Sequence, residues 1–385
     1  MRNLLTAASL LALTAVPGWA DPVKIGMITT LSGPGGYIGE QIRDAMQLAI
    51  DMEGGTLGGV EVQLVVEDDA LKPGQGLQIA QKYLADDGIK LITGIVFSNV
   101  AGATVPEVVD SGAIYVSPNA GPSNLAGAGC HENYFVVSWQ NDSLHEASGA
   151  AAKLLGYTKA VALAPNYQAG KDAIAGFTRL FEGEVTEIYT QLDQTDFASE
   201  MAQIRAANPE VVFQFHPGGL GIAFLKQYQQ AGLLGTIPMV LSEPSVDGVI
   251  LNAVGEAAVG LKATTHWNAD FDNEASKTFV AAWKEKHGDR PLTYYAQQSY
   301  DTALLIASAL KSTGGLDDID AFRTALRAAD FTSTRGEFAF GQNQHPVQDW
   351  YMVDIVADAN GKPTAVTGAK LREAVGDIYA ADCKM

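Results

Sequence analysis

Cysteine and positive charge are both scarce in this sequence of 385 residues. Only Cys130 and Cys383 occur, and they form no C-x-x-C motif, which excludes a thiolate zinc site and a dithiol redox centre. The 25 Lys and Arg stand against 44 Asp and Glu, which gives a formal net charge of -19. A surface of that charge repels phosphate backbones and acidic lipid, so we expect no nucleic-acid partner.

The motifs of common hydrolases and metal sites are absent as well. Neither G-x-S-x-G nor H-E-x-x-H occurs, and His145-Glu146 lacks the second histidine of a zinc site. Asp270-x-Asp272 is not followed by the glycine that a calcium loop needs. The loop 33–39 resembles a dinucleotide-binding turn, but Ile38 stands at its third glycine position. We therefore expect a protein that is not an enzyme and that holds no metal or cofactor.

The chain begins with a segment typical of export. Arg2 precedes an apolar run, 4–16, and Ala20 is a small residue before a cleavage point. A membrane span needs about 20 apolar residues, so this run is too short to be an anchor. We predict a signal peptide of residues 1–20, cleaved after Ala20, and no later segment that spans a membrane.

Export gives the two cysteines a possible common role. In an oxidising compartment, a lone pair in a large protein most simply forms one disulfide. Cys130 and Cys383 would then close a loop over most of the chain. Two unrelated thiols are the alternative that the sequence leaves open.

Short apolar strands alternate with amphipathic helices along most of the sequence. This alternation favours parallel sheets covered by helices on both faces. It occurs twice, which predicts two α/β lobes, each with a doubly wound parallel sheet. Later in the chain we expect long helices at 274–286 and 294–312 and an antiparallel hairpin of 349–356 with 364–367.

Two loops that follow consecutive strands carry small residues and precede helices. They are Phe97-Ser98-Asn99 and the segment 117–122, which includes Asn119, Ala120 and Gly121. Ser98 can cap a helix, and free N–H groups at a helix start attract a carboxylate. Each loop alone is explained equally well as ordinary turn chemistry. Ligands in open α/β sheets bind outside such strand ends, so we predict a binding site there.

Several segments, in one order over the whole mature chain, resemble the leucine/isoleucine/valine-binding proteins of ABC transporters. They are Lys24–Pro34, Asp68-Asp69, Gly94–Asn99, Val116–Pro118, Val254–Gly260 and Tyr295–Leu304. The resemblance implies a type I periplasmic binding fold, a periplasmic location, a monomer, and a membrane permease as partner. It also implies three crossovers near 140, 266 and 345. Lobe 1 would comprise 21–139 plus 267–344, and lobe 2 would comprise 140–266 plus 345–385.

The resemblance also implies roles for single residues. Ser98 matches a carboxylate-binding serine, and Asn119, Ala120 and Gly121 match its backbone-donor loop. Glu243 matches the acid that receives an α-ammonium group. Small residues replace larger wall residues of the amino-acid binders at three positions, which predicts a wider cavity; these positions are Gly121, Ala169 and Gly218.

Other segments are similar to a branch of the family that binds aromatic acids. They are Asn166–Asp172, Arg335–Gly341, Gln348–Tyr351 and Cys383–Met385. The aromatic side chains expected around the ligand are Tyr37, Phe97, Tyr167, His266 and Trp267. We therefore favour an aromatic carboxylate as the ligand, with Glu243 accepting a ring hydroxyl, over a branched-chain amino acid. An exported enzyme and the ligand-sensing partner of a membrane receptor are the alternatives from other classes.

Overall fold

The computed structural model describes residues 21–385. The first apolar segment of the mature sequence forms an inner strand of a parallel sheet. Strand β1 (Val23–Thr29) lies between β3 and β4, and the order is β2-β3-β1-β4-β5-β6. All neighbours are parallel except the edge strand β2. The other strands are β2 (Thr56–Leu57), β3 (Val60–Asp68), β4 (Leu91–Thr93), β5 (Ile114–Ser117) and β6 (Tyr134–Val136). The predicted signal segment lies outside the described residues.

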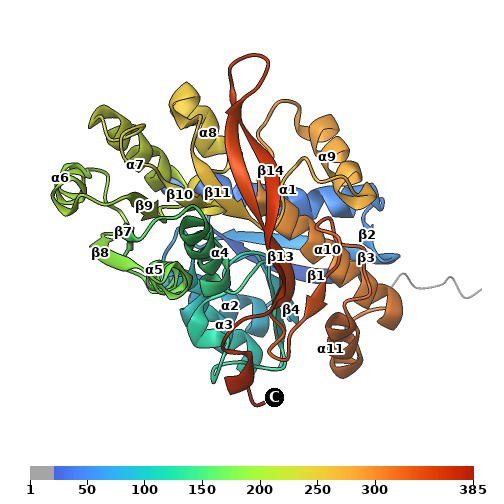
Figure 1. Ribbon diagram of the computed structural model, residues 1–385. Coiled ribbons are helices and arrows are strands. Elements are labelled where there is room, and N and C mark those ends of the chain that lie inside the picture. The colour runs from blue at the N-terminus through green and yellow to red at the C-terminus, as the bar shows by residue number, and fades with distance from the viewer. Residues whose placement is uncertain (1–20) are drawn as a thin grey trace, which may run out of the picture.

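Helices from both ends of the chain cover this first sheet (Figure 1). They are α1 (Gly36–Met52), α2 (Pro73–Ala85), α3 (Ser98–Asp110), α9 (Glu274–His287), α10 (Tyr294–Thr313) and α11 (Ile319–Ala328). Helix α1 buries Ile38, Ile42 and Met46 at helical spacing. Its partner α10 is more than 200 residues away in sequence, yet Ser299 Oγ donates to Ile42 O at 2.6 Å.

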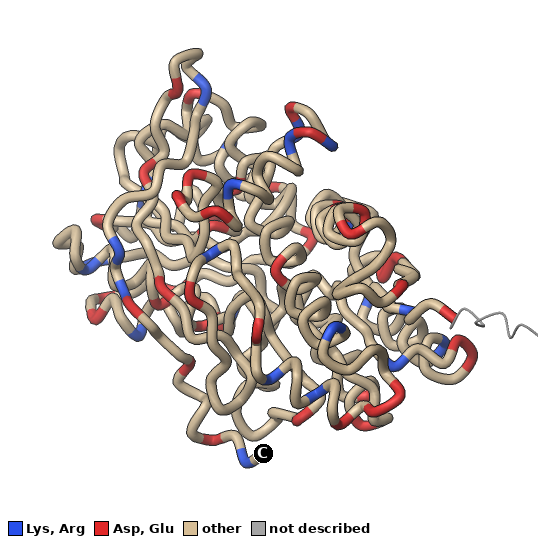
Figure 2. Tube along the Cα trace, turned by 90° about the vertical axis from the view of Figure 1, so that its right-hand side faces the viewer, with Lys and Arg blue, Asp and Glu red and all other residues tan. Residues whose placement is uncertain are grey.

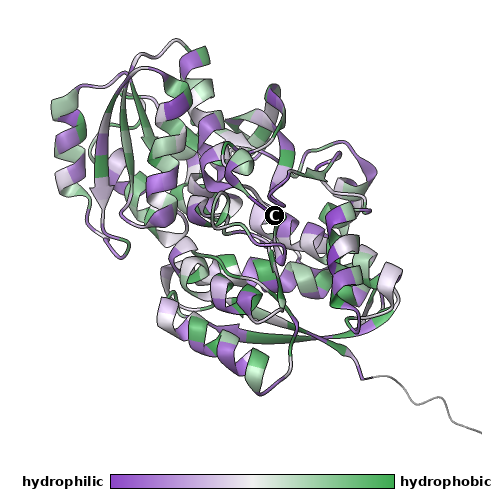
Figure 3. Cartoon of the chain, turned by 90° about the horizontal axis from the view of Figure 1, so that it is seen from below, coloured by the Kyte–Doolittle hydropathy of each residue, from purple (hydrophilic) through white to green (hydrophobic). Residues whose placement is uncertain are grey.

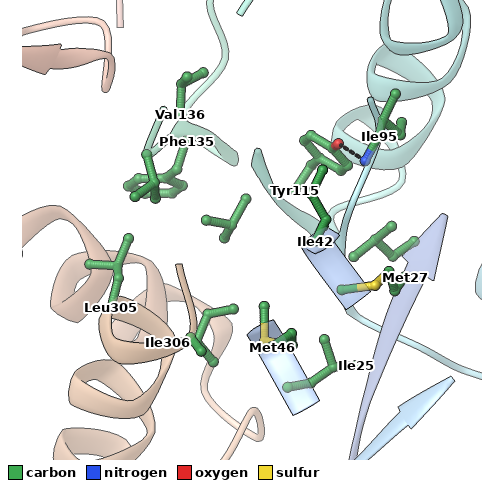
Figure 4. Packing of buried hydrophobic residues seen from close by; sticks show 14 of the residues in the cluster. Ile25, Met27, Ile42, Met46, Ile95, Tyr115, Phe135, Val136, Leu305 and Ile306 are labelled. Atoms are coloured by element: carbon green, nitrogen blue, oxygen red, sulfur yellow. Dashed lines mark hydrogen bonds between the residues drawn. The ribbon is translucent and has the colours of Figure 1, made fainter. Parts of the chain in front are cut away.

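The core of the first sheet is a continuous apolar cluster (Figure 4). Ile25 and Met27 of β1 pack with Met46 of α1 and Ile306 of α10. Tyr115 brings a hydroxyl into this core, and that hydroxyl accepts the Ile95 N–H at 3.0 Å. A buried hydroxyl needs such a partner, and this bond holds the loop after β4, where the site begins.

A second parallel sheet repeats the pattern. Strands β8 (Glu184–Thr190), β7 (Lys159–Pro165) and β9 (Val211–Gln214) are parallel neighbours, and a bridge from Val212 to Met239 links them to β10 (Val240–Ser242). Next come β11 (Lys262–Thr265) and the antiparallel β13. The helices here are α4 (Asn141–Leu154), α5 (Gln168–Phe181), α6 (Ala198–Ala207), α7 (Gly219–Gln230) and α8 (Gly248–Val254). Apolar residues gather inside both units and polar ones outside (Figure 3). The predicted fold class is confirmed.

The expected hairpin is present and longer than predicted. It comprises β13 (Pro346–Ala357) and β14 (Pro363–Val375), and it projects beside α8 in Figure 1. The first residues of β13 pair with β12 (Ala339–Phe340), whereas later ones pair with β11. The prediction was too short because β14 is partly exposed and bulges interrupt its register, so its apolar alternation is weak.

Cys130 and Cys383 form a disulfide with a Cα–Cα distance of 5.7 Å and a sequence separation of 253. The segment after β14 therefore returns to the first sheet. On the way, Tyr379 Oη donates to Asp142 of α4 at 3.0 Å, and Asp377 accepts from Asn343 at 2.7 Å. The bond fastens the C-terminal end to the loop before β6 of the first sheet.

Removing this disulfide is expected to destabilise the protein strongly. In the chain-entropy description, a cross-link over so long a loop contributes on the order of 4–5 kcal/mol. The double variant Cys130→Ser/Cys383→Ser should therefore lose about that much free energy of unfolding, measured by urea titration against the oxidised wild type. A loss below about 1 kcal/mol would contradict this view of the bond.

Candidate functional site

The carboxyl ends of β4 and β5 bring two predicted loops together. Phe97 and Ser98 follow β4 and begin α3, and Asn119 and Ala120 follow β5. Asn119 Nδ2 donates to Val96 O at 2.6 Å, which fixes one loop against the other. Because α3 begins at Ser98, the N–H groups of its first turn face the same edge of the sheet. This edge carries an anion-binding geometry.

A narrow pocket of about 30 Å³ lies where these loops face the second sheet. Among the predicted site residues, those that line it are Phe97, Ser98, Asn119, Ala120 and Tyr167. The other polar or aromatic lining residues are Trp139, Asn141, His145, Phe215 and Tyr295. The lining includes no Lys or Arg. An anion here would have to be held by neutral donors.

Asn141, the first residue of α4, connects the two sides of the pocket. Its Nδ2 donates to Ser98 Oγ at 3.1 Å and to Asp172 at 2.9 Å, while its Oδ1 accepts the Gly121 N–H at 3.3 Å. Ser98 Oγ accepts from Asn141, so its own O–H proton is free to point to a ligand. Burial raises the pKa of Asp172, against the opposing hydrogen bonds from Ser123 and Asn141.

Of the three small residues that predicted a wider cavity, Ala169 lines the pocket, whereas Gly121 and Gly218 do not. A Cβ on Gly121 would lie 1.9 Å from Trp139 O, so the glycine lets two backbones approach closely. A Cβ on Gly218 would lie 3.1 Å from Pro34 O, in the opposite half of the molecule. The expectation of a larger cavity was wrong at both positions, because neighbouring backbone fills the space that the missing side chains leave.

Aromatic rings form one wall of the pocket. Tyr167 is stacked on Phe215 with centroids 6.4 Å apart and an interplanar angle of 13°, and Phe97 lies 6.5 Å from Tyr167. Burial raises the pKa of Tyr167 far above its ordinary value, so the phenol stays neutral. Such surfaces suit a flat, unsaturated ligand.

His145 lies one helical turn after Asn141 on α4 and faces the same pocket. Its ring is edge-on to Phe215 at 4.8 Å, and its Nδ1 is 3.0 Å from Ser242 Oγ. Burial lowers the pKa of His145 to about 3, so the imidazole is neutral.

Glu243 and His266, both predicted as ligand-binding residues, contact each other. His266 Nδ1 is 2.6 Å from Glu243 Oε1, and the other carboxylate oxygen accepts from the Thr265 hydroxyl. His266 Nε2 is 3.1 Å from Gln297 Oε1. Burial lowers the pKa of His266, although the charge of Glu243 opposes that shift. Both side chains are thus engaged outside the pocket lining.

Tyr37, Asn99, Gly121 and Trp267 also lie outside the pocket lining. Trp267 packs on Phe279 and donates from its indole nitrogen to Ser276 at 3.0 Å. It borders a separate cavity of about 290 Å³, together with Glu243 and Asp247.

Tyr37 reaches from α1 to the second half of the molecule. Its hydroxyl donates to Asp247 Oδ2 at 2.5 Å, while Asp247 Oδ1 accepts the Val249 and Ile250 N–H groups at the start of α8. Burial raises the pKa of Asp247 to about 6, against these hydrogen bonds. Asn99 Oδ1 is buried with no hydrogen-bond partner in the described part of the chain.

Our reading of the sequence did not identify the pocket residues Asn141 and His145, nor the aromatic residues Trp139, Phe215 and Tyr295. Asn141 and His145 do carry a signal in the sequence. Their signal is a pair of polar residues four apart at the start of an amphipathic helix, which places both on one face. Residues 21–385 contain no cluster of three or more His, Cys, Asp or Glu that could hold a metal ion. In the same range, no helix is long and apolar enough to cross a membrane.

Comparisons with known proteins agree with this fold. A family model described as periplasmic binding protein matches residues 22–362. The "Leu/Ile/Val-binding protein homolog 6" of Brucella melitensis biotype 1 is 26% identical over 368 residues, which cover 93% of each chain.

Solved structures match as well. An ABC-transporter solute-binding protein of R. palustris, in complex with benzoate, has a TM-score of 0.88 and 30% identity, over 94% of this chain and 100% of that one. A second, from Rhodopseudomonas palustris BisB5 in complex with 3,4-dihydroxy benzoic acid, has a TM-score of 0.85 and 29% identity, over 93% and 99%. The chain therefore belongs to the periplasmic binding protein family, as a solute-binding component of an ABC transporter.

Proposed function

We propose that this protein binds a small aromatic carboxylate in the pocket between its two sheets and delivers it to a membrane permease. The carboxylate contacts the Ser98 hydroxyl and the N–H groups at the start of α3 and at Ala120. The ring lies against Tyr167 and Phe97. The observation that carries this choice of ligand is the engagement of Glu243.

Glu243 is the acid that an amino-acid ligand would need for its ammonium group. Its two oxygens already accept from His266 and Thr265, and it borders a different cavity from the one that Ser98 lines. An ammonium group held in the pocket that Ser98 lines would therefore find no carboxylate among the lining residues, and a buried charge without a partner is costly. An acid without an ammonium group avoids this cost.

The relatives support both ligand classes to different degrees. The solved structures at 30% and 29% identity carry benzoate and 3,4-dihydroxy benzoic acid. The curated relative at 26% identity is named for leucine, isoleucine and valine. A branched-chain amino acid therefore remains the second candidate. Catalysis is not part of the proposal, because binding and release account for the site.

Binding requires the two halves of the molecule to separate and close. The pocket encloses only about 30 Å³, and Tyr37 of α1 donates a hydrogen bond to Asp247 in the other half of the molecule. We propose a hinge motion between two lobes that divide near residues 140, 266 and 345. We also propose that the protein acts as a monomer in the periplasm.

Titration calorimetry tests the ligand. We expect benzoate-type acids to bind with a micromolar Kd or tighter, at least ~8 kcal/mol, and leucine not to bind. Ser98→Ala should weaken binding by roughly 1–3 kcal/mol, because it removes a hydrogen bond to a charged group. Ser111→Ala, at the other end of α3, is the matched control and should have no effect. Tight leucine binding without any response to aromatic acids would reject the proposed ligand.

The carboxyl group of Asp247 should make stability depend on pH. Its pKa is raised from 3.8 to about 6 in the folded protein, so folding favours the protonated form. Its contribution is therefore fully present below about pH 4 and is lost as the pH rises through 6, a decrease of about 3 kcal/mol. Asp247→Asn keeps the helix cap but does not titrate. The difference in unfolding free energy between wild type and variant, measured at pH 4 and pH 7, should change accordingly; a constant difference would refute this assignment.

The exported form should begin at Asp21. Residues 1–20 have the charge, apolar run and small residues of a cleaved signal peptide. Intact-mass analysis of periplasmic protein should show a chain of residues 21–385. A periplasmic species that keeps residues 1–20 would disprove the cleavage site.

A further inference from the structure

His145 is the one imidazole that lines the ligand pocket, and nothing in the described protein explains its free nitrogen. Nδ1 is 3.0 Å from Ser242 Oγ, while Nε2 has no hydrogen-bond partner among residues 21–385. The residue as a whole is 1% exposed, and it lines the pocket. A ring nitrogen on the wall of a pocket is available to form a hydrogen bond with a ligand group.

The position of His145 relative to Asn141 indicates which part of a ligand it meets. The two residues are four apart on α4, so they share one face and are separated by roughly 6 Å along the helix axis. Asn141 holds Ser98, at the end of the pocket proposed for the carboxylate. One helical turn is comparable with the separation of two substituents on opposite sides of a benzene ring.

The surroundings of His145 indicate what kind of ring substituent, opposite the carboxylate, it could bind. The imidazole is neutral and packed against Phe213 and Phe215 at 5.6 and 4.8 Å. It cannot pair an anion by charge, and it gives a cation no counter-charge. A hydroxyl is neutral and both donates and accepts, so it can pair with Nε2 in either tautomer that the Ser242 hydroxyl allows.

We propose that His145 is a specificity-determining residue that recognises a ring hydroxyl, so that the ligand is a hydroxylated aromatic acid. This inference rests on the proposed function. It replaces Glu243, which we expected to accept the hydroxyl and which is engaged by His266 and Thr265. Ser242 is a positioning residue, because it orients the imidazole without lining the pocket.

The experiment compares ligands across variants by titration calorimetry. Wild type is titrated with benzoate, 3-hydroxybenzoate, 4-hydroxybenzoate and leucine. We expect at least one hydroxybenzoate to bind about tenfold or more tightly than benzoate, the size of one well-made hydrogen bond. His145→Leu should reduce that ratio to about twofold while benzoate still binds. His145→Gln, which keeps a donor and an acceptor, should retain part of the preference.

His216→Gln is the matched control. His216 is also buried, with a pKa lowered to about 3, but it pairs with Thr190 and Gln214 and does not line the pocket. The variant should keep the wild-type ratio. Ser242→Ala should lower the ratio without abolishing benzoate binding, which a purely structural role of Ser242 would not do.

The outcomes separate this inference from the proposed function. Equal ratios in wild type and in His145→Leu, or wild-type preference for benzoate, would overturn the role of His145 and leave the aromatic-acid proposal standing. Binding of leucine alone would reject the aromatic ligand itself. If His145→Leu does not fold, as judged by circular dichroism, the ratios of wild type, His145→Gln and Ser242→Ala decide the question.

Discussion

The ion pair of Arg335 with Asp301 holds together the segments that pass between the two sheets. Arg335 Nη1 donates to Ser138 O at 3.2 Å, just before α4, and to Gln348 of β13 at 2.6 Å. Asp301 accepts from Arg335 Nε at 3.3 Å and also from Ser333, Thr334 and Gln297. Two buried charges cost desolvation energy, and these hydrogen bonds offset part of that cost, while Arg335 Nη2 has no partner among the described residues. The pair thereby fixes where α4 begins, and α4 supplies Asn141 and His145.

The same hydrogen-bond network extends to Glu243, the residue that we expected to contact the ligand. Gln297 joins Asp301 to His266 Nε2, and His266 Nδ1 engages Glu243. A polar chain therefore runs from the passage between the sheets to Glu243. Because Glu243 is bonded to His266 and lies outside the pocket, the residues that line the pocket offer neutral donors and aromatic rings. They offer no carboxylate for an ammonium group. The hydrogen bonds that join the two sheets therefore also bear on which ligand we propose.

The spacing of apolar residues and the order of the strands were sufficient to predict the fold and part of the pocket lining. The alternation of strands and helices predicted the two parallel sheets, and the loops after β4 and β5 placed Ser98 and Asn119 at one edge. Of the aromatic residues predicted to contact the ligand, only some line the pocket. Phe97 and Tyr167 face the pocket, whereas Trp267 is held in the core by Ser276 and Phe279. Which ring faces a cavity depends on packing between distant segments, and no local pattern carries that information.

An anionic ligand has to be reconciled with a net charge of -19. Acidic residues are spread along the whole chain trace in Figure 2, and the carboxylate of Asp172 accepts a hydrogen bond from Asn141. Asn141 stands between Asp172 and Ser98, so the acid meets an amide donor and the ligand meets a hydroxyl proton. For the proposed ligand, the attraction comes from fixed dipoles in a buried pocket, where they act more strongly than in water. Selection by such neutral groups depends on the shape and hydrogen bonds of a ligand more than on its charge.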